Sequence, residues 1–479
     1  MDKNLNRQTA KQKKIRAQKT YMAIKIQAFF LVLFLFAIIG LLIFLRPTES
    51  KVEKRELEKF PSFTLSAFLD GSYFNQISTW YADTFPFREA LLQANSSFKN
   101  LYGIHSEQFI SNSSGGGDEI PSGKLDLTET ESKDQTDSQT QSDSSNESSQ
   151  ASTDESQTAQ TETQQETLPD GTIHAVPEVA GDIYISGNRA FGLYYFSLDG
   201  AKAYINMMNK AQERFNGIAT IYDILAPTSV GIGLDDEAQK AINSSNQKEA
   251  FDLIFENLNE NIKKVSIFDT LKAHNSEYIY FNTDHHWTAL GAYYAYEEFC
   301  KVKGITPTPI DEYQKVEYPN FLGSFYASSN QSPALAANPD TLIGYIPKST
   351  NSMVYYNNSF QPINWFVVND VSEYDSASKY SAFVAGDEPF AYIDNPTLND
   401  GSACAVVKES YGNAFIPFLV DHYQHVYIVD YRYFSKYPEF EGSLHKLVTE
   451  KNVQDIIFLN NSDAITNIDR VQAMEALLK

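Results

Sequence analysis

An unbroken apolar run near the N-terminus is the feature that most constrains this chain. Residues 28–45 read AFFLVLFLFAIIGLLIFL, which is long enough for a helix that crosses a bilayer. Residues 1–25 carry eight lysines and arginines against one acid, an excess typical of the cytoplasmic side of a membrane segment. The sequence therefore predicts a cytoplasmic N-terminus at residues 1–25, an anchor at residues 26–46 and an extracytoplasmic remainder.

Two other interpretations of this run remain open. A cleaved signal peptide is one, although the run is long for such a peptide and no small-residue cleavage motif follows it. A buried core helix is the other, and the basic flank argues against it.

Composition divides the rest of the chain. Residues 47–110 mix helical periodicity with turn residues and are expected to fold as the first part of the extracytoplasmic domain. Residues 111–170 are rich in Ser, Thr, Gln, Asp and Glu, with fourteen acids from Asp118 to Asp170. Such a segment buries too little apolar surface to offset its ordering entropy, so we predict a disordered acidic linker or insertion. A spacer through a cell-wall layer is the plain interpretation, and a regulatory segment is the alternative.

Residues 171–479 alternate apolar, strand-like runs with helical patterns. The strand-like runs include ATIYDILA, ACAVV and NVQDIIFLN, and EAFDLIFENL and TALGAYYAYEEFCKVKG are amphipathic. Strands separated by helices of ten to fifteen residues indicate βαβ units and a parallel sheet. Functional residues of such sheets gather in the loops at the carboxyl ends of the strands.

The bulk composition excludes some classes of function. A net charge of −23 argues against a nucleic-acid partner, because phosphate binding needs a basic surface. Cys300 and Cys404 are the only cysteines, so no disulfide framework is expected, and one bridge or two free thiols remain open.

Ser410 is expected at a strand-to-helix turn. The buried run 403–407 precedes it, and AFIPFLVDHY, which follows, looks helical apart from Pro417. A serine at such a turn presents its hydroxyl, and the backbone N–H groups after it can form an oxyanion hole. A serine that only caps a helix is the alternative.

The stretch YFNTDHHWTAL, residues 280–290, brings an acid and two histidines together. It too is expected to follow a strand, residues 278–281, and to precede a helix, so it should share the sheet edge with Ser410. A nucleophilic serine needs a base, and the base needs an acid. Asp284 with His285 or His286 supplies both, and Trp287 is expected to pack beneath the turn.

Asp284, His285 and His286 allow two other interpretations, a metal site and a helix cap with surface histidines. Asp, His and His could bind zinc, but adjacent residues rarely point at one ion, and no spaced HxxxH or CxxC supplies further ligands. We therefore predict no metal and no cofactor. In the other interpretation, Asp284 caps a helix and the histidines are ordinary surface groups.

The chain resembles a known family. DHHW followed downstream by a strand–serine turn is similar to the DHHW protein family of low-GC Gram-positive bacteria. That family resembles the SGNH-hydrolase-like proteins that O-acetylate alginate and other exopolysaccharides. Four further stretches also resemble family elements: DTFPFRE (83–89), YDILAPTS (222–229), FLGSFY (321–326) and VDYRYF (429–434). The serine context, KESYGN, differs from the GDS block of ordinary SGNH enzymes, and the acidic segment 111–170 is not shared.

The resemblance implies an SGNH-hydrolase-like α/β/α sandwich with a central, mainly parallel sheet. Relatives carry Asp-x-His-Trp, which makes His286 the base, Asp284 its acid and Ser410 the nucleophile. The implied oxyanion and substrate-binding residues are Tyr411, Asn413, Thr228, Tyr431 and Arg432. Core packing is the alternative for the VDYRYF aromatics.

The function implied is that of a membrane-anchored O-acyltransferase, which acetylates a cell-envelope polysaccharide through an acyl-enzyme. An esterase with the same site is the second possibility, and a non-catalytic glycan-binding or assembly protein is the third. The expected partners are the surface polysaccharide and a multi-spanning membrane-bound O-acyltransferase that delivers the acetyl groups. The expected location is the cell surface of a Gram-positive bacterium.

Overall fold

The structure is a computed structural model. It describes residues 46, 49–50, 55–56, 59–64, 68, 72–86, 109–110, 117–127, 183–329, 331–357 and 359–479. The predicted anchor at residues 26–46 lies outside the described residues except for Arg46. Within the parts of the chain that the structure describes, no helix is both long and apolar enough to span a bilayer.

The chain divides into two compact units, residues 1–104 and 105–479. In the first, the short strands β1 (Glu49–Ser50) and β2 (Arg55–Glu56) pair antiparallel. The helix α3 (Ser72–Asp83) belongs to the same unit, and the Arg46 guanidinium lies 3.9 Å from the Trp80 ring centroid.

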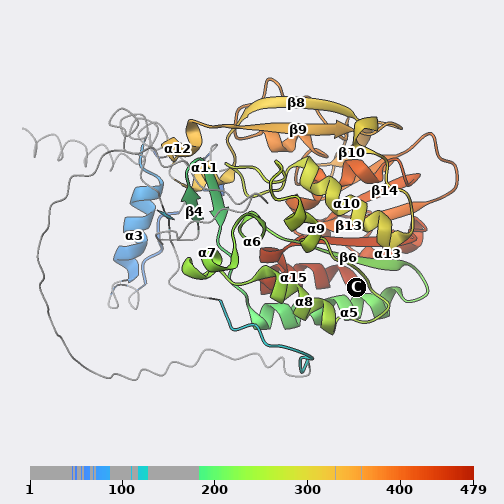
Figure 1. Cartoon of the computed structure of the whole chain (residues 1–479), viewed down its shortest axis with the longest axis horizontal. Coiled ribbons are helices and arrows are strands. Elements are labelled where there is room, and N and C mark those ends of the chain that lie inside the picture. Colours follow the sequence, from blue (N-terminus) through green and yellow to red (C-terminus); the bar gives the residue numbers. More distant parts are fainter. Residues whose placement is uncertain are drawn as a thin grey trace, which may run out of the picture. The chain divides into compact units, whose positions relative to one another are not determined.

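An eight-stranded mixed sheet forms the centre of the second unit (Figure 1), in the order β11-β10-β12-β14-β13-β15-β6-β7. Neighbouring strands from β14 through β13, β15 and β6 to β7 are parallel, whereas β12, β10 and β11 extend the sheet antiparallel. Its strands are β6 (Thr220–Ala226), β7 (Lys263–Val265), β10 (Ser352–Tyr356), β11 (Pro362–Phe366), β12 (Phe390–Asp394), β13 (Ala403–Lys408), β14 (His425–Asp430) and β15 (Asp455–Asn461).

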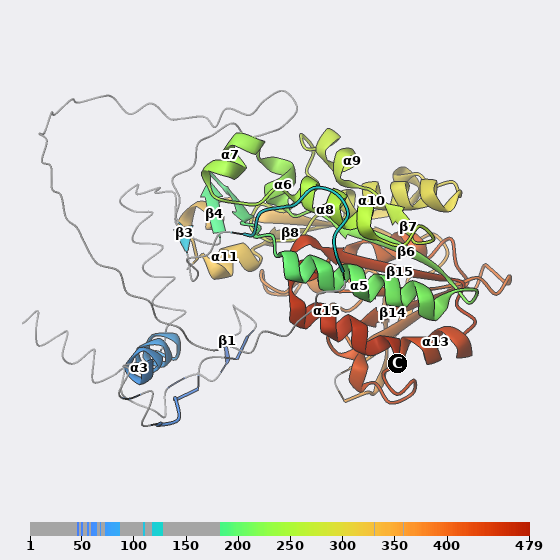
Figure 2. The same ribbon diagram turned by 90° about the horizontal axis from the view of Figure 1, so that it is seen from below.

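Helices cover both faces of this sheet. Figure 1 and Figure 2 show α10 on one face, and α5 and α15 on the other. Every residue of β13 and β15 is buried, as expected for central strands packed on both sides. The α-helices of this unit are α5 (Leu198–Phe215), α6 (Ser229–Gly233), α7 (Asp236–Ala241), α8 (Gln247–Asn257), α9 (Phe268–Ala273), α10 (Ala289–Lys303), α11 (Ser324–Ser328), α12 (Pro333–Ala336), α13 (Leu444–Glu450), α14 (Ser462–Thr466) and α15 (Ile468–Glu475).

Short elements complete the unit. Strands β3 (Phe109–Ile110), β4 (Ile183–Ser186) and β5 (Arg189–Gly192) form one small sheet, and β8 (Gln314–Phe321) and β9 (Asp340–Ile346) form another. The 3₁₀ turns are η2 (Ile310–Glu312), η3 (Lys379–Ala382), η4 (Ser410–Ala414), η5 (Ile416–Leu419), η6 (Phe434–Lys436) and η7 (Ala476–Leu478). An α/β fold with a large central sheet is thus confirmed, and the sheet is mixed, since β12, β10 and β11 add antiparallel strands to its parallel part.

The structure corrects the predicted linker in one place. Residues 117–127, which the composition assigns to a disordered segment, run in extended form along the folded unit. The Asn257 side chain accepts a hydrogen bond from Leu125 N at 2.8 Å and donates one to the Gly123 carbonyl at 3.2 Å. Leu125 and Leu127 also pack against the core. Those few apolar residues and their satisfied backbone groups explain why this part is ordered.

Candidate active site

Ser410 begins the turn η4, separated by one residue from the end of the buried strand β13, and it is only partly buried. The predicted strand-to-turn position is therefore correct. The predicted helix after it is wrong: residues 410–419 form two consecutive 3₁₀ turns. Pro417 lies inside the second turn, where its ring and missing N–H disfavour an α-helix.

The DHHW loop, residues 284–287, approaches Ser410 from the α10 side of the sheet. His286 Nε2 lies 2.7 Å from Ser410 Oγ, and His286 Nδ1 lies 2.6 Å from Asp284 Oδ1. An ionised carboxylate can only accept hydrogen bonds, so Nδ1 carries the proton and Nε2 is left to accept the serine hydroxyl. The structure thus brings Ser410, His286 and Asp284 into the linear arrangement that nucleophilic catalysis requires.

Asp284 is almost completely buried, at 4% exposure, yet it has several hydrogen-bond donors. Its Oδ1 also accepts the backbone N–H of His286 at 3.0 Å, and its Oδ2 accepts that of Ser324 at 2.8 Å. Burial alone would raise the pKa of Asp284, but the two adjacent histidines and these hydrogen bonds lower it below its ordinary value. The carboxylate is therefore ionised and can orient the imidazole.

Rings on both sides hold the His286 imidazole in place. Tyr380 stacks on one face at a centroid distance of 3.9 Å and an angle of 10°, and its hydroxyl donates to the Ser410 carbonyl at 3.0 Å. His285 covers the other side at 3.8 Å. The fully buried Trp287 donates from Nε1 to the Tyr411 carbonyl at 2.9 Å, so it ties the DHHW loop to the turn after Ser410.

The strand expected before this loop is absent from the central sheet. Residues 278–281 contain only an isolated bridge between Tyr280 and Trp287. Asp340 binds the loop instead: its carboxylate accepts the backbone N–H groups of Asn282 at 2.9 Å and Thr283 at 2.7 Å. The Asp340 side chain, which is distant in sequence, thus satisfies the backbone N–H groups that a neighbouring strand would otherwise bind. Nothing in the sequence around residues 278–283 indicates this contact.

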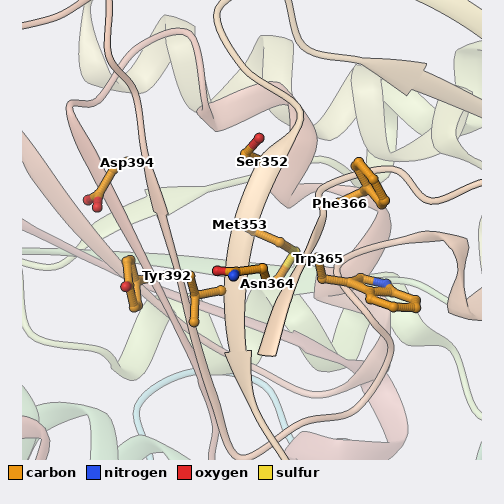
Figure 3. A pocket seen from close by; sticks show the side chains of 8 residues that line it. Ser352, Met353, Asn364, Trp365, Phe366, Tyr392 and Asp394 are labelled. Carbon is orange, nitrogen blue, oxygen red and sulfur yellow. The ribbon is translucent and has the colours of Figure 1, made fainter. Parts of the chain in front are cut away.

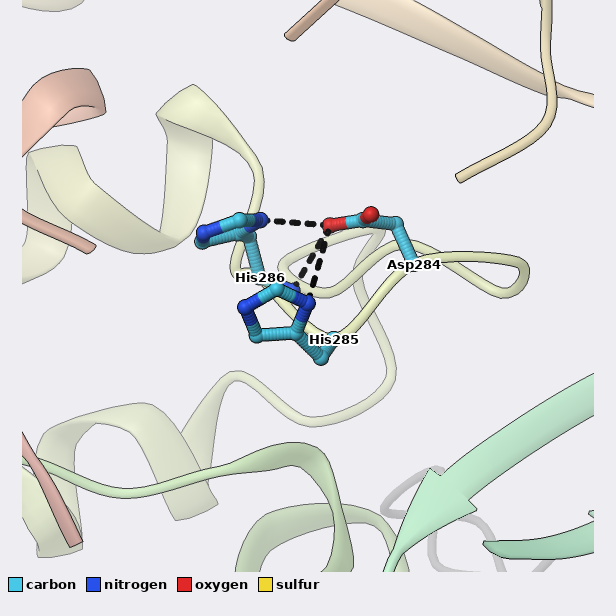
Figure 4. Close-up of side chains that lie close together, drawn as sticks. All are labelled: Asp284, His285 and His286. Atoms are coloured by element: carbon cyan, nitrogen blue, oxygen red, sulfur yellow. Dashed lines mark hydrogen bonds and ion pairs between the residues drawn. The ribbon is translucent and has the colours of Figure 1, made fainter. Parts of the chain in front are cut away.

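Asp284, His285 and His286 also form a group whose ligand-type atoms lie within 4.8 Å of one another (Figure 4). The hydrogen bonds favour acid–base chemistry over metal binding. His286 Nδ1 is bound to Asp284, His286 Nε2 to Ser410, and His285 Nδ1 lies 2.6 Å from Ser324 Oγ. A shared ion would have to displace these partners.

Both predicted oxyanion donors already have partners. The backbone N–H of Tyr411 donates to Glu409 Oε2 at 3.1 Å, and the Asn413 side-chain amide donates to Asp387 at 3.0 Å. Glu409 is itself buried, and its other oxygen accepts the N–H of Asn461 at the end of β15. The Tyr411 N–H is therefore occupied by Glu409, and one of the two amide hydrogens of Asn413 is occupied by Asp387.

The predicted substrate-binding residues differ in accessibility. Tyr431 has no exposed surface, so the prediction that it contacts the substrate is wrong and core packing holds instead. Arg432 forms two hydrogen bonds to Asp430, at 2.8 and 2.6 Å, and its side chain is partly exposed. Thr228 Oγ1 and N are bonded to the Gln247 side chain at 2.7 and 2.9 Å, so both its polar groups are occupied.

A second polar cluster includes Lys408, the last residue of β13. Lys408 and Asp430 are completely buried and pair at 3.1 Å, and Arg432 also binds Asp387 at 3.0 Å. Asp387 follows three consecutive residues with positive φ: Val384 at 46°, Ala385 at 64° and Gly386 at 84°. A β-branched residue is strained there, and such strain often accompanies functional sites.

A separate groove of about 370 Å³ lies on the antiparallel part of the sheet (Figure 3). In register, Asp394 pairs with His425 at the start of β14, whereas Ser410 follows the carboxyl end of the adjacent strand β13. The groove therefore lies toward the opposite edge of the sheet. It is lined by Ser352, Met353, Val354, Asn364, Trp365, Phe366, Tyr392 and Asp394.

Sequence reasoning did not assign roles to four residues that shape the site. Ser324 lies within the family element FLGSFY, but its contacts to the DHHW loop depend on the fold and not on that pattern. Tyr380, Asp340 and Glu409 carry no local pattern that distinguishes them. Cys300 and Cys404 are both buried free thiols.

Fold and site together define a mixed α/β protein with a serine, a histidine and an aspartate linked at the carboxyl edge of its sheet. The model of the DHHW protein family matches residues 53–429, and the chain belongs to this family. A search of the curated proteins gives no match.

Solved structures support the same fold. A DHHW family protein from Eubacterium siraeum is 24% identical with a TM-score of 0.54, and the alignment covers 61% of this chain and 93% of that one. Bacillus cereus PatB1 with a sulfonyl adduct is 16% identical with a TM-score of 0.51, covering 60% of this chain and 97% of that one.

Proposed function

We propose that this protein is an O-acyltransferase that acetylates a cell-envelope polysaccharide, with Ser410 as nucleophile, His286 as base and Asp284 as its acid partner. The observation that carries the proposal is the pair of hydrogen bonds from Ser410 Oγ to His286 at 2.7 Å and from His286 to Asp284 at 2.6 Å. The choice of acetyl as the acyl group and of a polysaccharide as the acceptor rests on the family resemblance to SGNH-hydrolase-like O-acetyltransferases.

The reaction proceeds in two transfers. His286 Nε2 takes the proton of Ser410 as the hydroxyl oxygen attacks the acyl carbonyl, and it returns that proton to the leaving group as the acyl-enzyme forms. A sugar hydroxyl then gives its proton to His286 and attacks the ester. The O-acylated sugar leaves, and Ser410 recovers its proton. If water replaces the sugar, the same site is an esterase.

Topology and partner belong to the same proposal. Residues 26–46 would anchor the protein with its N-terminus in the cytoplasm, which leaves the site outside the cell membrane beside its glycan. A multi-spanning O-acyltransferase would deliver the acetyl group. Cysteine-accessibility labelling on intact cells tests the orientation: cysteines introduced at exposed positions after residue 183 should be labelled from outside.

The nucleophile is tested with a sulfonyl fluoride and an activated acetyl ester. The B. cereus PatB1 structure carries a sulfonyl adduct. Mass spectrometry of this protein should find one sulfonyl group on the peptide that contains Ser410, and none in Ser410→Ala. Wild type should release acetate or acetylate a glycan acceptor, and Ser410→Ala should reduce both by at least about 10³-fold.

Surface-glycan acetylation in the native bacterium separates the remaining functions. Loss of acetyl groups in the Ser410→Ala strain supports transfer, and a gain of acetyl groups supports the esterase. Unchanged acetylation with no labelling of Ser410 would leave the glycan-binding protein as the better explanation.

A further inference from the structure

We infer that His285 is a substrate-contacting residue, which donates a hydrogen bond from Nε2–H to the oxyanion that forms when Ser410 attacks an ester carbonyl. The inference rests on the proposed acyl transfer. It assigns a role to the first histidine of the DHHW loop, which the acid–base arrangement of Asp284, His286 and Ser410 does not use.

The predicted donors are partly occupied, which leaves a role for a further one. A tetrahedral intermediate requires hydrogen-bond donors aimed at its oxygen. The N–H of Tyr411 is bonded to the Glu409 carboxylate, and one of the two amide hydrogens of Asn413 is bonded to Asp387. A carboxylate beside Ser410 would repel an oxyanion, so a donor from the DHHW loop would stabilise it.

Contacts with Ser324 and Tyr411 hold His285 in one orientation. Ser324 Oγ accepts the backbone N–H of His285 at 3.2 Å and lies 2.6 Å from its Nδ1. The Tyr411 hydroxyl donates to the His285 carbonyl. A hydroxyl has one proton and two acceptor lone pairs, so Ser324 Oγ can accept the backbone N–H and donate its own proton to Nδ1. In that arrangement, which the inference assigns, the ring proton resides on Nε2.

The orientation places this donor beside the nucleophile. The His285 and His286 rings lie 3.8 Å apart, and Figure 4 shows the ring nitrogens opposite Asp284 pointing the same way. The corresponding nitrogen of His286 is the one that binds Ser410. The His285 side chain is 40% exposed, so the donor can reach a substrate.

Charge also suits the role. Burial and the adjacent His286 lower the pKa of His285 to about 4, so the ring is neutral at physiological pH. A neutral imidazole polarises a carbonyl oxygen without transferring its proton. It therefore does not compete with His286 for the serine proton.

The rival explanation is that His285 only stacks on His286 and keeps its ring in place. Two variants separate the explanations. His285→Phe keeps a ring for stacking but has no N–H, whereas His285→Gln loses the ring but keeps an N–H near the position of Nε2. Both are compared with wild type in steady-state hydrolysis of p-nitrophenyl acetate, after thermal unfolding has shown that each variant is folded.

We expect His285→Phe to lower kcat by about 10²–10³-fold with little change in KM, as for other oxyanion donors. His285→Gln should retain at least ten times the kcat of the Phe variant. The inference is overturned if the Phe variant stays within about threefold of wild type, or if the Gln variant is the more impaired of the two.

A spectroscopic measurement does not depend on activity. Long-range ¹H–¹⁵N spectra should place the His285 proton on Nε2 in wild type, and Ser324→Ala should shift the tautomer equilibrium toward Nδ1–H. A wild-type His285 protonated on Nδ1 would contradict the inference. The proposed function fails separately, if wild type is neither acylated nor sulfonylated at Ser410.

Discussion

Two polar clusters near Ser410 stabilise buried charge in different ways. In the DHHW loop, one buried carboxylate, Asp284, is held by hydrogen bonds from the His286 ring and two backbone N–H groups. In the second cluster, Lys408 and Asp430 are fully buried and form an ion pair. In that second cluster, among the described residues, Glu388 Oε2 and Asn413 Oδ1 are buried without a hydrogen-bond partner.

This difference indicates which cluster can take part in catalysis and which one contributes to stability. A hydrogen-bonded chain that ends on a partly exposed serine can move a proton, because the histidine can accept and release it. A buried ion pair moves no proton, and its removal leaves an uncompensated charge in the interior. We therefore expect changes in the DHHW loop to affect turnover, and changes in the ion-pair cluster to affect stability.

The strongest test of this contrast uses the same change on both sides. Asp284→Asn should lower kcat by about 10⁴-fold, as in serine proteases, because the amide cannot hold the histidine tautomer. Asp430→Asn should instead lower the free energy of unfolding by about 3–5 kcal/mol, because two cations lose their counter-ion. Urea unfolding and ester hydrolysis are measured for both variants. If Asp430→Asn loses turnover while its stability is unchanged, the contrast is wrong.

A smaller effect is expected at Gly323, which packs directly on the triad acid. A Cβ added there would lie 2.2 Å from Asp284 Oδ2 and 2.3 Å from its Cβ. Gly323→Ala should therefore displace the carboxylate and lower kcat by about 10²-fold, since misplacement by about 1 Å has that cost. Gly192→Ala is the matched control, because its nearest contact, Phe325, is at an ordinary 3.4 Å. Equal kcat values for the two variants would contradict the expectation.

The ion-pair cluster should also make stability depend on pH through Glu388. Burial, together with Asp387 and Asp430, outweighs the attraction of Lys408 and raises the pKa of Glu388 from 4.5 to about 7. The unfolded chain ionises first as pH rises. The stability contributed by the neutral folded carboxyl is thus complete below pH 4.5 and is lost by about pH 7.

Glu388→Gln should remove that loss and gain about 1–2 kcal/mol at pH 7.5 relative to wild type, with little difference at pH 4.5. Urea midpoints at the two pH values measure it. The exposed Glu373→Gln serves as control. A gain of the same size at both pH values would show that the ionisation of Glu388 is not the cause.

The smallest effect is expected at Tyr380, which contacts both His286 and Ser410. Tyr380→Phe removes the hydrogen bond to the Ser410 carbonyl but keeps the stacked ring, so it should cost about 0.5–1.5 kcal/mol of stability and leave kcat within about threefold. Tyr380→Leu should lower kcat further, because the imidazole loses one of its two stacking faces. Equal kcat values for the two variants would show that stacking does not position His286.

Local patterns predicted much of the framework. The buried runs became β6, β13 and β15, and the amphipathic run after DHHW became α10, whose end at Gly304 lies in the left-handed region that favours glycine. The position of Ser410 just after a buried strand was equally readable. These features depend on residues near one another in the chain, which is why the sequence reveals them.

Errors arose where distant residues decide the outcome. The stretch before DHHW is rich in aromatic residues, as a strand would be, yet Asp340 holds it as a loop. Residues 117–127 read as part of an acidic linker, yet Asn257 gives their backbone partners. Propensity and composition indicate which secondary structure a segment favours in isolation. Neither contains information about a side chain from a distant part of the sequence that binds the segment in the fold.

The sequence by itself determined the residue types of the site, its place at the carboxyl ends of the strands of a sheet, and which histidine pairs with Asp284 through the family pattern. Only the tertiary structure decided that Glu409 binds the Tyr411 N–H and Asp387 binds the Asn413 amide, that Tyr431 is buried, and that Ser324 contacts His285. The physical reason is that a hydrogen bond between residues far apart in the chain depends on where the fold places both of them. The sequence next to either residue does not indicate that placement.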